Sequence, residues 1–167
     1  MRRYFIVFLF TTLLFLSCSE VKNERTNGYS LIPLPNEITT HSGKLILQDK
    51  VTFSVPSDLS SPILFDYFSD VLKNTPIHLE KIQDSDKALM SLTIDNSLSD
   101  EEYNLDISSD KIEIKSNSTG AGFFYGIQTL VQLMPVEIVD TSHKSITKIE
   151  LPAVSISDAP RFPYRGA

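Results

Sequence analysis

Residues able to do metal or nucleophilic chemistry lie far apart along this sequence. The three histidines, His41, His78 and His143, have no other histidine or cysteine near them, and Cys18 is the single cysteine. A protein zinc site needs several such side chains at short, regular spacing, and a serine hydrolase of the common kind needs a Gly-x-Ser-x-Gly turn. Neither pattern occurs. The sequence therefore predicts no metal site and no nucleophilic elbow.

Two other patterns carry a weaker suggestion of chemistry. Carboxylates cluster at Asp84/Asp86 and at 100–102, but acidic residues in loops are usually solvated. The run from Gly120 to Gly126 is similar to a dinucleotide-binding fingerprint, yet its last gap is one residue too long. We therefore predict no catalytic residue and no cofactor in this chain.

Length and composition place the chain among ordinary globular proteins. It has 167 residues, of which 41% are hydrophobic and 22% charged, with a net charge of −6 and no tryptophan. This length suits one domain and is too short for a catalytic barrel, which needs about 200 residues. A net negative surface repels phosphate backbones, so nucleic acid is not expected as a partner.

The N-terminal segment 1–18 has the form of a bacterial lipoprotein signal peptide. Arg2 and Arg3 precede an uncharged apolar run, Tyr4–Leu16, which is too short to span a membrane. Cys18 follows the run where such proteins are cleaved and acylated, so we predict lipidation at Cys18 and a lipid-anchored place in the cell envelope, periplasmic or surface-facing. A plain signal peptide or an uncleaved anchor with an incidental cysteine remains the alternative. Residues 19–30 are polar and aperiodic and indicate a flexible tether.

From residue 31 onward the hydrophobic periodicity predicts an α+β domain. Its sheet is expected to be mainly antiparallel, with two helices packed on one face. The first helix should begin at Ser61-Pro62 and stop before Pro76; the second should be capped by Ser118-Thr119 and ended by Pro135. Small residues in the second helix indicate close packing on the sheet. The expected β segments are Lys44–Leu47 and Val51–Val55 as a hairpin, then Ile77–Glu80, Ala88–Ile94, Tyr103–Ile107, Lys111–Lys115, Val136–Val139 and Ile146–Ile156.

Two stretches resemble the family 20 β-N-acetylhexosaminidases, which are glycoside hydrolases. The run from Tyr103 to Leu133 resembles the "Y-x-L-x-I … I-x-I … G-x-F-Y-G-x-Q-T-L-x-Q-L" motif of their non-catalytic N-terminal domain. The run Asp158-Ala-Pro-Arg-Phe-Pro-Tyr-Arg-Gly166 resembles the junction that leads into their catalytic barrel. On this basis residues 31–156 are identified as the accessory domain and 157–167 as the junction into a barrel that this chain does not contain.

The resemblance implies a parent enzyme that removes terminal β-linked N-acetylglucosamine or N-acetylgalactosamine. In this family the substrate's own acetamido oxygen attacks the anomeric carbon, while an Asp and a Glu of the barrel position that group and act as general acid. No residue of this chain can inherit those roles. Arg165 matches the arginine that contacts hydroxyls of the terminal sugar, and Arg161 is expected at the seam between domain and barrel. The aromatic residues Phe123–Tyr125 are expected to pack in the core or at this seam.

Three hypotheses follow. The chain is the N-terminal part of a hexosaminidase whose partner is its own catalytic barrel; or it is a free-standing envelope lipoprotein domain that binds glycans or a partner protein; or it packs against a separately encoded barrel. The junction motif favours the first hypothesis, because a free-standing domain has no evident use for it. The lack of tryptophan disfavours the second, since tryptophan is the usual sugar-stacking residue.

Overall fold

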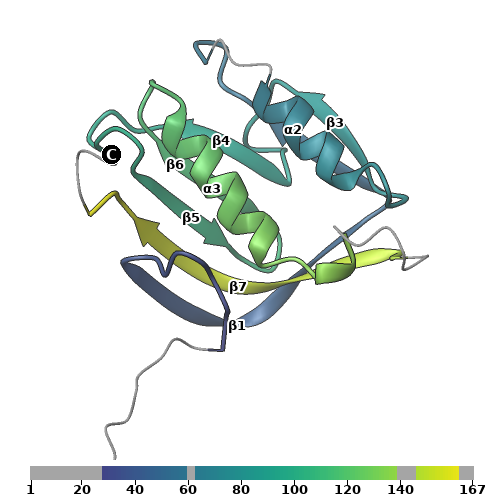
Figure 1. Cartoon of the computed structure of the whole chain (residues 1–167). Helices are drawn as coiled ribbons and strands as arrows, with labels where there is room; N and C mark the ends of the chain where they lie inside the picture. Colours follow the sequence, from purple (N-terminus) through teal and green to yellow (C-terminus); the bar gives the residue numbers. More distant parts are fainter. Residues whose placement is uncertain (1–27, 60–62, 139–145, 162–167) are drawn as a thin grey trace, which may run out of the picture.

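A single mixed sheet, covered on one face by two helices, makes up the part of the chain that the structure describes (Figure 1). The structure is a computed structural model, and it describes residues 28–59, 63–138 and 146–161. In chain order the elements are β1 (Glu37–Gln48), β2 (Lys50–Ser54), α2 (Ile63–Leu72), β3 (His78–Ile82), β4 (Met90–Ile94), β5 (Tyr103–Ile107), β6 (Ile112–Ser116), α3 (Ala121–Gln132), the 3-10 helix η2 (Val136–Ile138) and β7 (Lys148–Asp158).

The strand order of the sheet is β1-β7-β5-β6-β4-β2-β3. From β1 to β6 neighbouring strands run antiparallel, and from β6 to β3 they run parallel. The α+β class and the placement of both helices on one face are confirmed. Within the parallel half, α2 carries the chain from β2 to its parallel neighbour β3, the usual crossover connection.

The predicted hairpin between 44–47 and 51–55 is wrong. The first segment belongs to β1, which pairs with β7, and the second is β2, which pairs with β3 and β4. Only Asp49 separates the two strands, and its carbonyl accepts a hydrogen bond of 2.7 Å from the amide of His78 at the start of β3. A single residue cannot turn the chain back on itself, so the chain instead passes from one paired region of the sheet to another.

Two predictions beside α3 are also wrong. Ser118-Thr119 does not cap the helix: the N-cap is Gly120, with φ 88°, and no side chain caps it. The backbone amide and hydroxyl of Thr119 instead donate to Oδ1 of Asn117, which uses up the side chain expected to cap. After the helix, Val136–Ile138 forms a 3-10 turn rather than a strand, because it follows Pro135 at once and buries Ile138. The predicted cap of the first helix lies outside the described residues.

The core lies between the helices and the sheet, as the periodicity predicts. The alternating residues of β5 and β6 point their apolar side chains inward beneath α3, and Leu64, Phe68 and Leu72 of α2 are buried over the parallel half of the sheet, where Phe68 packs against Phe53 of β2. Tyr29 and Leu31, before β1, also pack against this core. Within the described ranges, no helix combines the length and apolar character needed to cross a membrane.

The helix α3 lies unusually close to β5 and β6, as its small residues predict. A Cβ atom at Gly126 would stand 2.6 Å from Cγ2 of Ile114, and one at Gly122 would collide with the carbonyl oxygen of Glu102 and the hydroxyl of Ser116. Because the Glu102 oxygen belongs to the backbone, it cannot rotate away. The distance between α3 and the sheet is therefore fixed by the absence of side chains at these positions.

We expect the substitution Gly122→Ala to lower the free energy of unfolding by about 1–3 kcal/mol, because the added methyl group must push α3 away from the sheet. Gln128→Ala, on the same helix and with the same new residue, should change it by less than about 0.5 kcal/mol. Urea unfolding followed by circular dichroism measures both. Equal stability of the Gly122→Ala variant and the wild type would contradict the tight contact.

Candidate functional site

Those residues singled out for chemistry that the structure describes do not come together. Arg165, Cys18 and His143 lie outside the described residues. His41 contacts the hydroxyl of Ser155 at 2.9 Å on the sheet surface, and His78 is exposed at the start of β3. Among the residues that the structure describes, no three histidine, cysteine or carboxylate side chains are close enough to hold a metal ion.

The acidic clusters stabilise loops. Asp84 accepts hydrogen bonds from the ammonium group of Lys87 and from the amide of Asp86, and the bond from Lys87 contributes most to lowering its pKa. In the second cluster, Asp100 accepts from the side-chain amide of Asn117 at 2.8 Å. Glu102 accepts from the amide and hydroxyl of Ser99. Asp84 and Glu102 are thus held by partners in their own turns, and Asp100 by a residue just after β6, so these carboxylates are not aimed at a common point.

A cleft of about 360 Å³ lies at the place where β7 ends. We call it the junction cleft, because the residues that lead toward Arg165 form one of its walls. The segment before β1 and residues of α3 contribute most of the remaining lining. Its lining residues are Pro33, Leu34, Glu101, Tyr103, Tyr125, Gln128, Thr129, Gln132, Asp158, Ala159, Pro160 and Arg161.

A buried hydrogen bond forms the floor of the junction cleft. The hydroxyl of Tyr103, on β5, lies 2.6 Å from the hydroxyl of Thr129, on α3. Burial raises the pKa of Tyr103 to about 12, with a smaller contribution from the negative charge of Asp158, and the bond to Thr129 acts in the opposite direction. The tyrosine is therefore neutral at physiological pH and joins the helix to the sheet.

The side formed by α3 combines an aromatic ring with amide groups. Tyr125, Gln128 and Gln132 recur at helical spacing and so lie on one face of α3. Oε1 of Gln132 accepts a hydrogen bond of 2.8 Å from the backbone amide of Ile32, which ties the segment before β1 to the helix. The sequence carried no local sign of this contact, since its partners are a hundred positions apart.

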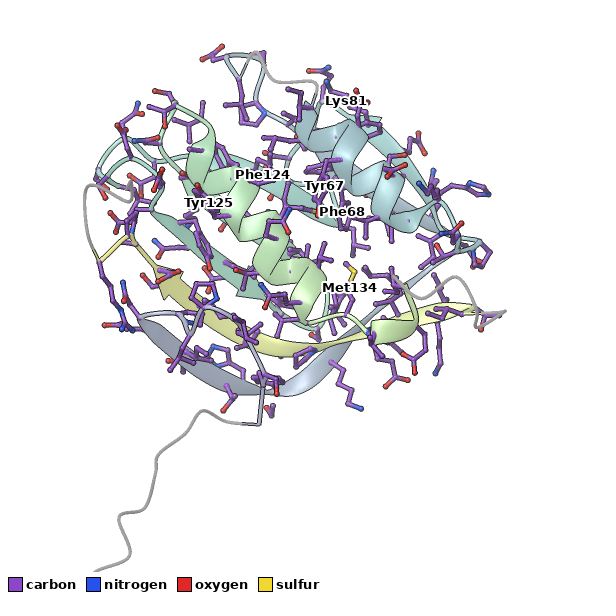
Figure 2. The ribbon with its side chains drawn as sticks, in the orientation of Figure 1. Tyr67, Phe68, Lys81, Phe124, Tyr125 and Met134 are labelled. Atoms are coloured by element: carbon purple, nitrogen blue, oxygen red, sulfur yellow. The ribbon has the colours of Figure 1, made fainter. Side chains whose placement is uncertain are left out.

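Aromatic rings continue from the cleft across the helical layer: Phe124 and Tyr125 are exposed, and Tyr67 is half-buried. Tyr67 on α2 and Phe124 on α3 have ring centroids 5.5 Å apart, and Phe124 and Tyr125 are 6.0 Å apart. Figure 2 places Tyr67 and Phe124 between the two helices, with Tyr125 on the side of α3 away from α2. Phe123 is fully buried in the core, whereas Tyr125 is 38% exposed and Leu34, across the cleft, is 48% exposed. We call Leu34, Tyr67, Phe124 and Tyr125 the aromatic face.

The wall where the chain leaves β7 is held by Asn36. The backbone amide of Asn36 donates to Oδ1 of Asp158, and its side-chain amide donates to the carbonyl of Ala159. Nε of Arg161 donates to Oδ1 of the same asparagine at 3.4 Å. Arg161 thus makes a structural contact, as predicted for it, but with its own domain. Neither Asn36 nor this contact was predicted.

The chemistry of the junction cleft is that of a docking site. No imidazole or thiol lines it, and its carboxylates are Glu101 and Asp158, the second of which accepts a hydrogen bond from Asn36. What it offers is an aromatic ring, apolar proline and leucine surface, and amide groups able to donate and accept. Such a lining binds and orients another surface, and it lacks a matched acid and base.

Comparison with known proteins gives a consistent result. The model of "Glycosyl hydrolase family 20, domain 2" matches residues 28–159. Over 147 residues the chain is 31% identical to a beta-hexosaminidase of Porphyromonas gingivalis, covering 86% of this chain and 19% of that protein. It is 26% identical to beta-hexosaminidase subunit A1 of Dictyostelium discoideum, covering 82% of this chain and 26% of that protein.

Solved structures share the fold. The N-acetyl-beta-hexosaminidase of Streptomyces plicatus superposes with a TM-score of 0.71 at 24% identity, over 81% of this chain and 27% of that one. The beta-N-acetylhexosaminidase of Bacteroides fragilis gives a TM-score of 0.60 at 25% identity, over 78% of this chain and 25% of that one. The chain thus spans about a fifth to a quarter of the length of these relatives.

Replacing Tyr103 by Phe should lower the free energy of unfolding by about 1–2 kcal/mol, because the Thr129 hydroxyl is left buried without its partner. Tyr125→Phe is the matched control: Tyr125 is 38% exposed, and the change should be within about 0.5 kcal/mol. Urea unfolding at neutral pH measures both differences. Two equal losses would show that the buried bond contributes nothing specific.

The comparison of the wild type with Tyr103→Phe also has an expected pH dependence. Because the folded-state pKa of Tyr103 is raised to about 12, this tyrosine contributes full stability below pH 10 and loses it as the pH rises toward 12. The advantage of the wild type over Tyr103→Phe should therefore shrink by about 1.4 kcal/mol per pH unit above pH 10. The other tyrosines are common to both proteins and cancel. A constant difference between pH 9 and 11 would contradict the raised pKa.

Proposed function

The chain belongs to glycosyl hydrolase family 20 and contains the accessory domain of that family, and we propose that it is the N-terminal part of an envelope-bound β-N-acetylhexosaminidase. The observation that carries the proposal is the continuity between this domain and the junction motif. The family model ends at residue 159, and the strand β7 ends at Asp158, where the Asp-x-Pro-Arg-Phe run toward Arg165 begins.

The proposed reaction is the removal of terminal β-linked N-acetylglucosamine or N-acetylgalactosamine from glycans. The acetamido oxygen of the substrate attacks the anomeric carbon, a general acid protonates the leaving oxygen, and water then opens the cyclic intermediate. The carboxylates for these steps belong to the barrel. Arg165 is the one residue of this chain that we assign to the substrate, because a guanidinium presents several fixed donors to adjacent sugar hydroxyls.

The partner we propose for the described domain is the catalytic barrel of the same protein. The junction cleft supports this, because it lies where the chain leaves β7 and has an apolar lining, and the aromatic face supports it through the exposed surface of Leu34, Phe124 and Tyr125. Leu34 and Tyr125 keep 48% and 38% of their surface in water, on either side of a cleft that also offers the amides of Gln128 and Gln132. Apolar surface of this kind, rimmed by polar groups, is typical of a protein–protein contact.

We further propose that the protein is a lipoprotein of the bacterial cell envelope. Support comes from the basic start, the short apolar run and Cys18 directly after it. Residues 19–27 would separate the acylated cysteine from the first described residues of the domain. Anchoring would hold the enzyme where extracellular glycans arrive and would keep its products near the cell.

We expect this chain alone to show no turnover of a chromogenic N-acetyl-β-glucosaminide. A protein expressed from the same reading frame, extended beyond codon 167 through a barrel, should release the chromophore. Within the extended protein, Arg165→Ala should raise KM about tenfold or more, since it removes charged hydrogen bonds to the sugar. Turnover by the chain alone that survives repurification would contradict the proposal. A stop codon at position 168 would instead support the free-standing lipoprotein that binds glycans or a partner protein.

Labelling of expressing bacteria with radioactive palmitate tests the anchor. The wild type should incorporate label and sediment with membranes, and Cys18→Ser should lose both, because no other thiol exists in the chain. Ser19→Ala, beside it, is the control and should keep its label. Label retained by the Cys18→Ser variant would rule out acylation at this position.

A further inference from the structure

Asn36 uses its backbone amide and both ends of its side chain on the segment where the chain leaves β7. The three contacts are the bonds to Oδ1 of Asp158 at 3.1 Å, to the carbonyl of Ala159 at 3.0 Å and from Nε of Arg161 at 3.4 Å. We infer that Asn36 is a positioning residue, which fixes the path of the chain from β7 toward Arg165. The inference rests on the proposed function and deepens it.

The position of Asn36 in the sheet explains why a side chain is needed there. The ladder between β1 and β7 ends at the pair Glu37 and Ser157, and Asn36 stands one residue beyond it. Asp158 is still paired with Tyr103 of β5 on its other side. From Ala159 on, no strand partner is available within the described residues. The hydrogen bonds from Asn36 therefore hold the chain beyond the end of the ladder.

Asn36 is itself held by a stiff segment. Pro33 and Pro35 restrict the backbone before it to extended conformations, and the amide of Ile32 is bonded to Gln132 of α3. Leu31 is buried in the core. Asn36 is therefore held rigidly by the domain, and its hydrogen bonds hold Asp158, Ala159 and Arg161 in place as well.

Only an amide side chain satisfies both side-chain contacts. Its NH₂ group donates to a carbonyl and its oxygen accepts from a guanidinium, so aspartate would lose the first contact and alanine would lose both. Aspartate would also place a second carboxylate beside Asp158, where like charges repel. These differences give the substitutions distinct expected effects.

The consequence for function follows from distance along the chain. Arg161 precedes Arg165 by four residues, so a junction that is free to move would carry the sugar-contacting guanidinium with it. Hydrogen bonds to two neighbouring hydroxyls require placement within a fraction of an ångström. A loosened junction should therefore weaken substrate binding before it affects the fold.

The first test uses the full chain 1–167 in mild detergent and measures tryptic cleavage after Arg161. Trypsin must draw the residues around its site into an extended conformation, which requires the Asn36 contacts to open. Asn36→Ala should raise the cleavage rate about fivefold to tenfold, since two hydrogen bonds are lost, and Asn36→Asp should also raise it. Asn104→Ala, the control on β5, should match the wild type, because no contact of its side chain supports the junction.

Unfolding is monitored in the same samples. The urea midpoint and the cleavage at all other lysines and arginines should stay at the wild-type values, which shows that the fold is intact. If Asn36→Ala does not fold, Asn36→Asp serves in its place, because aspartate keeps the acceptor for Arg161 but loses the donor to the carbonyl of Ala159. Wild-type cleavage rates in a folded Asn36→Ala or Asn36→Asp variant would overturn the inference.

The second test separates this inference from the proposed function. In the product extended through the barrel, Asn36→Ala should raise KM for the chromogenic substrate about threefold to tenfold with little change in kcat, and Asn104→Ala should change neither. An extended wild type without activity would refute the proposed function and leave the proteolysis result standing. If the extended protein is active and Asn36→Ala leaves its KM unchanged, the positioning role alone is refuted.

Discussion

The close approach of α3 to β5 and β6 is the constraint on which the rest of the structure depends. Gly122 and Gly126 let the helix lie against the backbone of Glu102 and the side chain of Ile114, at distances that no Cβ atom could share. At this separation the hydroxyls of Tyr103 and Thr129 meet at 2.6 Å. The same approach sets the height of the outer face of α3 above the sheet and so determines the depth of the junction cleft. A packing requirement inside the domain thereby shapes the surface outside it.

Much of the local structure could be predicted because the signals for it are local. The alternation in Tyr103–Ile107 and the glycines of α3 each predict a feature of their own segment, and the structure contains both. Strand order could not be predicted in this way: nothing within residues 44–55 indicates that β1 pairs with β7 a hundred residues on, and the hairpin prediction failed there. The contacts of Asn36 and Gln132 share this difficulty, because each joins residues 100 or more positions apart. The candidate site consists mostly of such contacts, so sequence patterns identified its residue types but not their assembly.

The use of charge in the domain agrees with a supporting rather than a catalytic role. An active site needs carboxylates whose environments push their pKa values apart, and such groups must face a shared space. Here Asp84, Asp100 and Glu102 each accept hydrogen bonds from loop residues close by, which fixes the loops between strands. The polar groups that line the junction cleft are the amides of Gln128 and Gln132 and the neutral Tyr103, together with the charged Glu101, Asp158 and Arg161. Asp158 and Arg161 are hydrogen-bonded to Asn36, so these two charges hold the junction segment in place.

The topology explains why such a domain would precede a catalytic unit. The strand β1 finds its partner only when β7 is present, since the register joins Glu37 to Ser157 and Gln48 to Lys148. The contacts of Asn36 with Asp158 and the residues after it form in the same step. The direction in which the chain leaves residue 158 is therefore set by the completed sheet rather than by the junction residues themselves. A domain closed in this way gives the residues after β7 a fixed starting point, and the burial of the sheet supplies stability that a short segment could not supply alone.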